Sequence, residues 1–120
     1  SNIIAGIFLS TGQDIGQVGT SSVCITDYFI EGDKLNITIT MPCLEVGTIG
    51  GGTDLSDQSC NLEIMSLDKK NNIYKPGYNS KLLSEIITST VLCGEISLMS
   101  SLVSNNLVSS HMKFNRGKVI

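Results

Sequence analysis

The sequence predicts an α+β fold, and three stretches of the 120-residue chain support this prediction. Apolar and polar residues alternate over residues 35–41, as they do in a strand with one buried face. A glycine-rich loop follows at 47–53. Apolar residues then recur close to the helical period over 79–104, which makes this segment the longest expected helix, with a break near Gly94.

The N-terminal segment is mostly apolar from residue 2 to about residue 10, and it ends at the turn-forming group Thr11-Gly12-Gln13-Asp14. This pattern is typical of a short buried element, either a helix or a strand. Of the two, we prefer the helix.

A β-hairpin is expected next, with strands at 23–29 and 35–41 separated by the turn-forming residues Glu31-Gly32-Asp33. The second strand shows the clearer alternation. Its expected buried face carries Leu35, Ile37, Ile39 and Met41. Pro42 ends this strand.

Helices and a linker fill the rest of the chain. Asp54 or Ser56 is a suitable N-cap for a helix that runs to about Ser66. Residues 68–77 are polar and rich in turn formers, so we expect an exposed excursion there. A short helix at 106–110 would leave His111, the only histidine, at its end.

Composition limits the classes of partner. The formal net charge is −3, with no block of lysine or arginine, which argues against binding of nucleic acids or anionic membranes. Charged residues make up only 16% of the chain, and the mean hydropathy is +0.20. The length allows one small domain or a piece of a larger one. The composition is apolar for a small free-standing domain, which favours missing neighbouring parts.

Neither a metal site nor a membrane span is expected. The four cysteines are widely spaced and have no histidine close in sequence, so we expect buried, reduced thiols and no bound metal; they are Cys24, Cys43, Cys60 and Cys93. The longest unbroken apolar stretch, at 3–9, is far shorter than the roughly 20 residues of a membrane helix.

The glycine-rich loop is the first candidate for chemistry. Gly50-Gly51-Gly52 followed by Thr53 presents backbone N–H groups that no side chain obstructs, which suits a phosphate or a nicotinamide ring. The loop matches neither the dinucleotide fingerprint nor the P-loop. The alternative is a glycine-rich turn at which two backbones pack closely.

Asp14 and His111 are the candidate ionisable groups. A carboxylate that follows an apolar element can orient a lysine or tune a proton donor, and the alternative is a turn aspartate. An imidazole is a suitable proton donor near neutral pH, and the alternative is a partly buried histidine bonded to backbone. We expect these two residues and the loop to belong to one active site.

These motifs together resemble the C-terminal part of the catalytic domain of HMG-CoA reductase, most closely the class I enzymes. The resemblance covers almost the whole chain, and its motifs occur in the family's order with near-family spacing. They are Thr11-Gly12-Gln13-Asp14, Ser21-Ser22, Cys24-Ile25-Thr26, Thr40-Met41-Pro42, residues 45–53, Gly94-Glu95-Ile96-Ser97-Leu98-Met99, Leu107-Val108, Ser110-His111-Met112 and Asn115-Arg116. The implied fold is part of the large domain of that enzyme.

The resemblance implies an NADPH-dependent oxidoreductase that converts HMG-CoA to mevalonate and CoA by two successive hydride transfers, a step of isoprenoid and sterol precursor synthesis. Asp14 would be the catalytic aspartate that hydrogen-bonds the active-site lysine. His111 would protonate the departing CoA thiolate.

The same resemblance implies binding roles. The loop would bind NADPH through Gly47, Thr48, Ile49, Gly50, Gly51, Gly52 and Thr53, and Asn115 and Arg116 would close over the cofactor. HMG-CoA would contact Ser97, Leu98 and Leu102 on the long helix. Asn2 matches an asparagine that helps to hold the lysine.

The chain also departs from the family. Where the family usually has Gln-Asn-Val-Gly-Ser-Ser-Asn, valines stand at Val18 and Val23, which weakens expected polar contacts near the cofactor. Gly117 occupies the position of a serine that many relatives phosphorylate. The catalytic glutamate, the catalytic lysine and the small cofactor-binding domain with its Asp-Ala-Met-Gly-Met-Asn motif have no counterpart here. We therefore expect these 120 residues alone to be inactive.

Location and assembly follow only from the resemblance. It implies a homodimer or homotetramer, and an endoplasmic reticulum membrane protein whose catalytic domain faces the cytosol, with this segment itself soluble. The competing hypothesis is a degenerate reductase-derived module that binds or interacts without catalysis. An unrelated soluble α+β domain is the third alternative.

Overall fold

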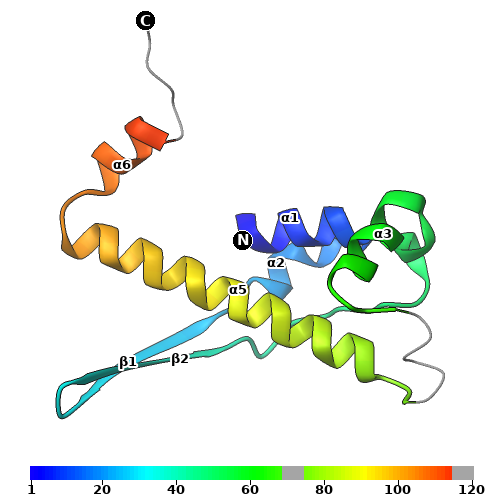
Figure 1. Ribbon diagram of the computed structural model, residues 1–120, viewed down its shortest axis with the longest axis horizontal. Helices are drawn as coiled ribbons and strands as arrows, with labels where there is room; N and C mark the ends of the chain where they lie inside the picture. Colours follow the sequence, from blue (N-terminus) through cyan, green and yellow to red (C-terminus); the bar gives the residue numbers. More distant parts are fainter. Residues whose placement is uncertain (69–74, 115–120) are drawn as a thin grey trace, which may run out of the picture.

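The computed structural model describes residues 1–68 and 75–114. Within them the chain is a mixture of helices and one two-stranded antiparallel sheet, as the sequence predicts (Figure 1). The elements are α1 (Asn2–Thr11), η1 (Ile15–Gln17), α2 (Val18–Ser21), β1 (Ile25–Glu31), β2 (Lys34–Thr40), η2 (Gly51–Asp54), α3 (Ser56–Ile64), α5 (Tyr78–Val103) and α6 (Leu107–Phe114).

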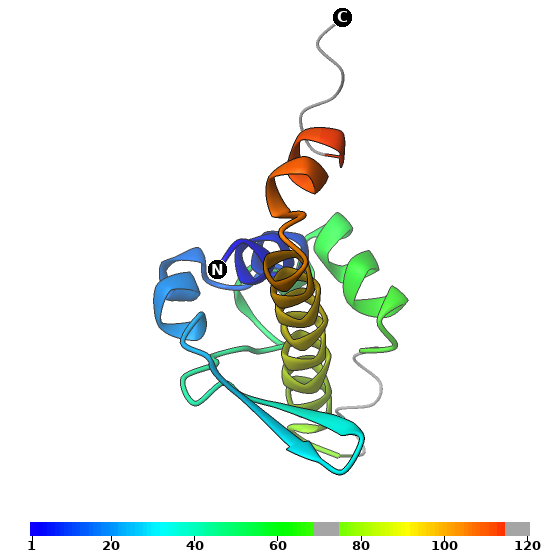
Figure 2. The ribbon, with the colours of Figure 1, turned by 90° about the vertical axis from the view of Figure 1, so that its left-hand side faces the viewer.

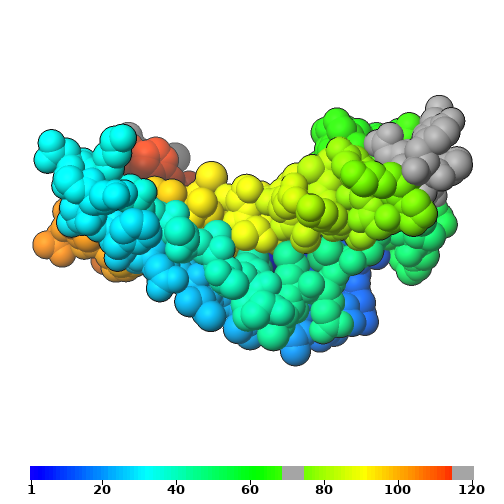
Figure 3. Space-filling model, turned by 90° about the horizontal axis from the view of Figure 1, so that it is seen from below, coloured from blue at the N-terminus to red at the C-terminus, as the bar shows by residue number. Residues whose placement is uncertain are grey.

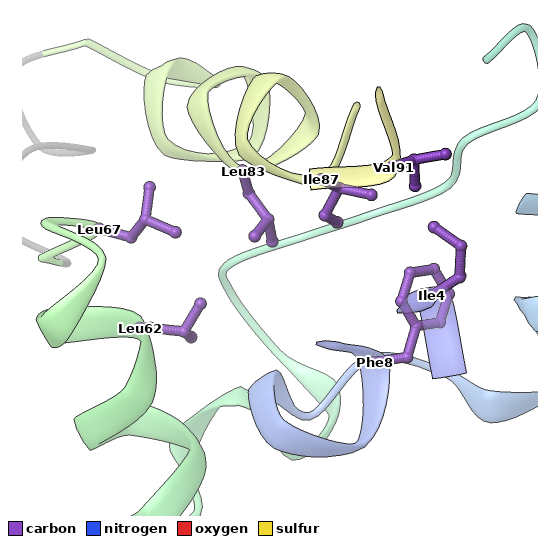
Figure 4. Close-up of a cluster of buried hydrophobic side chains, with 7 residues drawn as sticks. All are labelled: Ile4, Phe8, Leu62, Leu67, Leu83, Ile87 and Val91. Atoms are coloured by element: carbon purple, nitrogen blue, oxygen red, sulfur yellow. The ribbon is translucent and has the colours of Figure 1, made fainter. Parts of the chain in front are cut away.

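The core lies where α1 and α3 pack against the first half of α5. Figure 2 looks along α5 and shows these two helices beside it. Side chains from all three helices and from Leu67 point toward one another in Figure 4, because residues four apart lie on one face of a helix. The buried apolar residues are Ile4 and Phe8 of α1, Leu62 of α3, Leu67, and Leu83, Ile87 and Val91 of α5.

The helix preferred for the N-terminal segment is confirmed, and the long helix is confirmed with one correction. α5 continues through Gly94, where the sequence predicted a break. A Cβ atom at Gly94 would lie 2.5 Å from Cδ1 of Ile3, so the glycine provides the space in which α1 approaches α5. A glycine inside a helix costs about 1 kcal/mol, and here close packing with Ile3 offsets that cost.

The hairpin is confirmed, with Gly32 in the turn at φ +59° and Tyr28 opposite Ile37. Its expected buried face is only partly right. Ile37, Ile39 and Met41 are half-buried, but Leu35 is 60% exposed. The tip of the hairpin lies beside the second half of α5, away from the core (Figure 3). Leu35 borders an open hollow there with Ile96 and Val103 of α5, so it faces that helix without close packing. Alternation therefore predicted the strand correctly, whereas burial depends on a second layer.

Two helix ends differ from the prediction. α3 begins after Leu55, which is its N-cap, and no side chain caps it; Asp54 belongs to η2 instead. α6 extends to Phe114, so His111 lies inside this helix rather than at its end. The helical period does not specify where a short exposed helix stops, because fraying and capping decide it.

The thiols are more accessible than expected. All four cysteines are free, but Cys43, Cys60 and Cys93 are exposed, and only Cys24 is half-buried. In the part of the chain that the structure describes, no cluster of three or more metal-ligating side chains occurs. Of the excursion expected at 68–77, residues 69–74 lie outside the described residues, while Lys75 to Gly77 are exposed.

The described chain is extended rather than compact. Its Cα radius of gyration is 17.1 Å, against about 14 Å for a compact domain of this length. Large apolar side chains are exposed on β1, the second half of α5 and α6. This geometry agrees with the apolar composition, because much of the apolar surface is not buried within these residues.

α5, with 26 residues, is also long and apolar enough to cross a membrane, since an 18-residue window within it has a mean hydropathy of 1.6. The sequence prediction used unbroken apolar runs and therefore overlooked it, since serine and threonine interrupt its apolar residues. Core helices of soluble proteins pass the same test, so this property assigns no location to α5.

Candidate functional site

The first part of the site is the turn that ends α1. Gly12 adopts the left-handed conformation, with φ +72°, and the N–H groups of Gly12 and Gln13 donate to the carbonyl oxygen of Phe8. Glycine takes this conformation without a steric penalty, which explains its place at the end of the helix. The turn directs Gln13 and Asp14 away from the core helix.

The glycine-rich loop lies directly against this turn. A Cβ atom on Gly52 would lie 3.2 Å from the Cα atom of Gly12, and one on Gly12 would overlap the backbone of Gly52. The alternative interpretation of the glycine run, a close approach of two backbones, is therefore correct for Gly52. Gly50 and Gly51 serve differently, because both have positive φ and contribute to the pocket described below.

Side-chain hydrogen bonds connect the two segments. The amide of Gln13 donates from Nε2 to the carbonyl oxygen of Gly47 at 2.8 Å and accepts at Oε1 from the N–H of Gly47 at 2.8 Å. Nε2 of Gln17 donates to Oε2 of Glu45 at 2.9 Å. The N–H of Glu45 donates to Oγ of Ser21 at 3.1 Å. Residues 13–21 thereby hold the start of the loop.

Together the turn and the loop form an open pocket of about 320 Å³, in the lower range for small-molecule sites. Asp14 and most of the predicted cofactor loop thus share one cavity. Thr48 is buried and does not line it, and Gly52 lies against Gly12. The lining residues are Gly12, Gln13, Asp14, Gln17, Glu45, Val46, Gly47, Ile49, Gly50, Gly51 and Thr53.

Thr53 closes the loop from inside. Its hydroxyl group donates to the carbonyl oxygen of Gly50 at 2.7 Å, and its side chain is buried. This bond closes the turn from Gly50 to Thr53, in which Gly50 has φ +82° and Gly51 has φ +57°. Only glycine adopts such conformations readily, so the triple glycine is required by the shape of the loop as well as by the free space above it.

Asp14 has two roles in the structure. Its Oδ1 accepts a hydrogen bond from the N–H of Gly16 at 2.9 Å, which caps η1. The same exposed carboxylate lines the pocket. The turn-aspartate interpretation is therefore correct, and it is compatible with a chemical role because an exposed carboxylate retains further acceptor capacity.

His111 lies in a different hollow, between α5 and α6, of about 310 Å³. The hollow includes two predicted substrate-binding residues, Ser97 and Leu98, but not the third, Leu102. His111 itself is exposed rather than partly buried. The two hollows share no described lining residue, so this arrangement does not bring His111 next to Asp14.

The remaining predicted residues fall outside these hollows. Asn2 is exposed at the start of α1, and Asn115, Arg116 and Gly117 lie outside the described residues. Val18 packs against the core, and Val23 is exposed. Neither valine lines the described part of the Asp14 pocket, so the two departures from the family pattern do not alter its wall.

Sequence reasoning gave no role to Gln13, Gln17 or Glu45. Each of the hydrogen bonds that join them to the opposite segment crosses 28 or 34 residues of chain. A polar side chain does not reveal a distant partner in sequence. The only signal was their position, since Gln13 directly precedes Asp14 and Glu45 begins the loop motif.

Comparison with known proteins agrees with the resemblance. Residues 1–116 match the model of the hydroxymethylglutaryl-coenzyme A reductase family. The chain is 47% identical over 116 residues to 3-hydroxy-3-methylglutaryl-coenzyme A reductase 2 of Arabidopsis thaliana, with 97% of the chain covered. It is 49% identical over 117 residues to reductase 1 of Hevea brasiliensis, with 96% covered. It spans about a fifth (20%) of the length of each of these relatives. The chain therefore belongs to the hydroxymethylglutaryl-coenzyme A reductase family.

Proposed function

We propose that the protein containing these residues is an NADPH-dependent HMG-CoA reductase. It would reduce the thioester of HMG-CoA to the primary alcohol of mevalonate and release CoA, using two hydrides from two NADPH molecules. Family membership and the names of the relatives support the reaction. The structural observation that carries the proposal is the common pocket of Asp14 and the glycine-rich loop.

The loop at 47–53 is the proposed cofactor site. Gly50 and Gly51 have no side chains to block close approach, and the loop leaves a cavity beside them, so these residues fit a nicotinamide dinucleotide. The bound cofactor supplies hydride to the substrate carbonyl. Within the loop from Gly47 to Thr53, the residues that line the pocket would hold it through backbone groups, while Thr48 is buried and Gly52 packs against Gly12. Asn115 and Arg116 are proposed to complete the site.

Asp14 is proposed to act on the proton side of the reaction. Its position is fixed by the hydrogen bond from Gly16 N–H, while the carboxylate remains on the pocket wall. There it would accept a hydrogen bond from the catalytic lysine, which has no counterpart in these residues. The negative charge would keep that lysine protonated and oriented toward the developing oxyanion.

His111 is proposed to protonate the departing CoA thiolate. Ser97 and Leu98 lie with it in the hollow between α5 and α6, where they would contact the substrate. Leu102, one turn further along α5, and Asn2 are proposed to contribute at the edges of this site. His111 and Asp14 act on the same substrate in this proposal, which requires the hollow to be brought to the first pocket in the complete protein.

The complete enzyme needs groups that these residues lack. We propose that the 120 residues form the C-terminal part of the catalytic domain and that the catalytic lysine and glutamate come from other parts of the protein. The 120 residues alone would then be inactive. Assembly as a dimer or tetramer would cover the apolar surface of β1 and α5. Residence at the endoplasmic reticulum membrane, with the catalytic domain in the cytosol, is part of the same proposal.

A binding module without catalysis is the second candidate. The observation that favours it is the separation of His111 from the pocket of Asp14. Such a protein would bind NADPH or CoA compounds but would not transfer hydride.

The test is a coupled assay with the longest natural polypeptide that contains these residues. HMG-CoA-dependent loss of NADPH absorbance, with mevalonate as the product and two NADPH consumed per mevalonate, is the expected result. Binding of NADPH without any turnover would favour the binding module. The same assay with the 120-residue chain is expected to show no oxidation, and turnover there would refute the need for outside groups.

A further inference from the structure

The contact between Gln13 and Gly47 is the most specific link between the two halves of the Asp14 pocket. The primary amide of Gln13 pairs with both backbone groups of Gly47, as a neighbouring strand would, with both hydrogen bonds 2.8 Å long. The second N–H of its Nε2 donates to the carbonyl oxygen of Thr11 at 3.2 Å. Both N–H groups and the oxygen of this amide are therefore used. We call this arrangement the Gln13 clasp.

The clasp matters because the segment at 45–47 lacks the regular backbone hydrogen bonds of a helix or a sheet. These residues belong to neither a helix nor a strand, so backbone hydrogen bonds within an element do not fix their place. The bond from Gln17 to Glu45 is exposed to water, whereas the Gln13 bonds are partly buried and less open to competition. Gln13 connects the start of the loop to the end of α1 through these hydrogen bonds.

Its place in the chain links two parts of the site. Gln13 follows Gly12, whose backbone contacts Gly52, and precedes Asp14, whose carboxylate lines the pocket. A shift of the Gln13 side chain therefore moves the loop relative to Asp14. From this geometry we infer that Gln13 is a positioning residue that sets the distance between the glycine-rich loop and Asp14. The inference rests on the proposed function for its link to NADPH.

Two substitutions separate the hydrogen bonds from the volume of the side chain. Gln13→Met keeps the length and removes all three bonds, so the KM for NADPH is expected to rise by about tenfold, with a smaller change in the KM for HMG-CoA. Gln13→Glu keeps the acceptor for Gly47 N–H but places a negatively charged carboxylate oxygen against the carbonyl oxygen of Gly47, which repels it. The rise in the KM for NADPH is therefore expected to be larger than in Gln13→Met. Gln58→Met, on α3 and outside the pocket, is the matched control.

The pH dependence of Gln13→Glu provides a signature that a general loss of stability would not produce. A protonated carboxyl group presents one donor and one acceptor to Gly47, as the amide does. The KM for NADPH of this variant is therefore expected to fall back toward the wild-type value as the pH is lowered. Gln13→Met has no group that titrates and is expected to show no such recovery.

The decisive experiment combines kinetics of the full-length protein with amide hydrogen exchange. In Gln13→Met, the amides of Gly47 and of the loop at 48–53 are expected to exchange about tenfold faster, while those of α3 stay unchanged. Unchanged protection of Gly47, or equal changes in the KM values for NADPH and HMG-CoA, would overturn the inference. If the wild-type protein shows no turnover, the proposed function fails, and hydrogen exchange still decides whether Gln13 holds the loop.

Discussion

Gly12 and Gly52 meet backbone to backbone where the end of α1 contacts the glycine-rich loop. Gly12 has φ +72°, and a Cβ atom there would overlap the carbonyl group of Gly52. Gly12→Ala is therefore expected to lower the free energy of unfolding by about 2–4 kcal/mol, from left-handed strain and a forced shift of the loop. Urea denaturation of the purified protein measures this change.

Gly6→Ala is the matched control for that substitution. Gly6 lies inside α1, and nothing lies within 4 Å of a Cβ atom placed on it. Alanine favours a helix interior, so Gly6→Ala is expected to raise the free energy of unfolding by about 0.5–1 kcal/mol. Equal effects at the two positions would show that the contact with Gly52 does not constrain Gly12.

The periodic parts of the fold could be predicted from sequence, because local pattern decides them. Alternation identified β2, and the helical period identified α5, including Leu83, Ile87 and Val91 of the core. The sequence pattern could not predict how closely other elements pack against each helix or strand. Leu35 has the alternation of a buried residue but is 60% exposed, because it borders an open hollow beside α5 and not a closely packed layer. The presence of Gly94 in the sequence suggested a break in the long helix. The structure explains this glycine differently, because the side chain of Ile3 lies where a Cβ atom would be.

The site was predictable to a similar extent. Asp14 and the loop were recognised as motifs, and the structure places them in one pocket. The Gln13 clasp could not be recognised, because its partner is the backbone of Gly47, which has no sequence signature. The relation of His111 to Asp14 depends on where α6 lies in the complete protein, so their membership of one site stays a prediction.

Substitutions at Asp14 can separate the effect of its negative charge from the effect of its hydrogen bond with Gly16. Asp14→Asn keeps an oxygen that accepts the hydrogen bond from Gly16 N–H, so η1 stays capped and the fold is retained. It removes the negative charge that, in the proposed mechanism, keeps the catalytic lysine protonated. The kcat for HMG-CoA reduction is expected to fall by about 10²–10⁴-fold, with the KM for NADPH changed by no more than about twofold.

Asp14→Ala serves as the comparison in that experiment. It removes both the charge and the cap, so it is expected to add a loss of about 0.5–2 kcal/mol in unfolding free energy to the same loss of kcat. If Asp14→Asn retained the wild-type kcat while Asp14→Ala lost it, the cap rather than the charge would be the important property of this residue.

The core between α1, α3 and α5 is expected to be sensitive to loss of volume. Ile87 is fully buried and faces α1 and α3 in the cluster of Figure 4. Ile87→Ala is expected to lower the free energy of unfolding by about 2–5 kcal/mol, because it leaves a cavity. Ser89→Ala on the same helix, at an exposed polar side chain, is expected to change it by less than about 0.5 kcal/mol. Comparable losses at both positions would show that burial of Ile87 does not determine the stability of this core.

The role of His111 is tested by separating the two hydride transfers. In the proposed reaction, only the first transfer leads to expulsion of the CoA thiolate, whereas the second reduces an aldehyde that carries no thiol. His111→Gln removes the proposed proton donor, so the kcat for HMG-CoA is expected to fall by about 10²–10⁴-fold. Reduction of free mevaldehyde with NADPH is expected to fall far less, because no thiolate leaves in that step. Ser109→Gln, at an exposed side chain on the same helix that lines neither of the hollows beside His111, controls for disturbance of α6. Equal losses with HMG-CoA and with mevaldehyde would exclude thiolate protonation as the function of His111, since that role predicts a defect confined to the substrate that releases CoA.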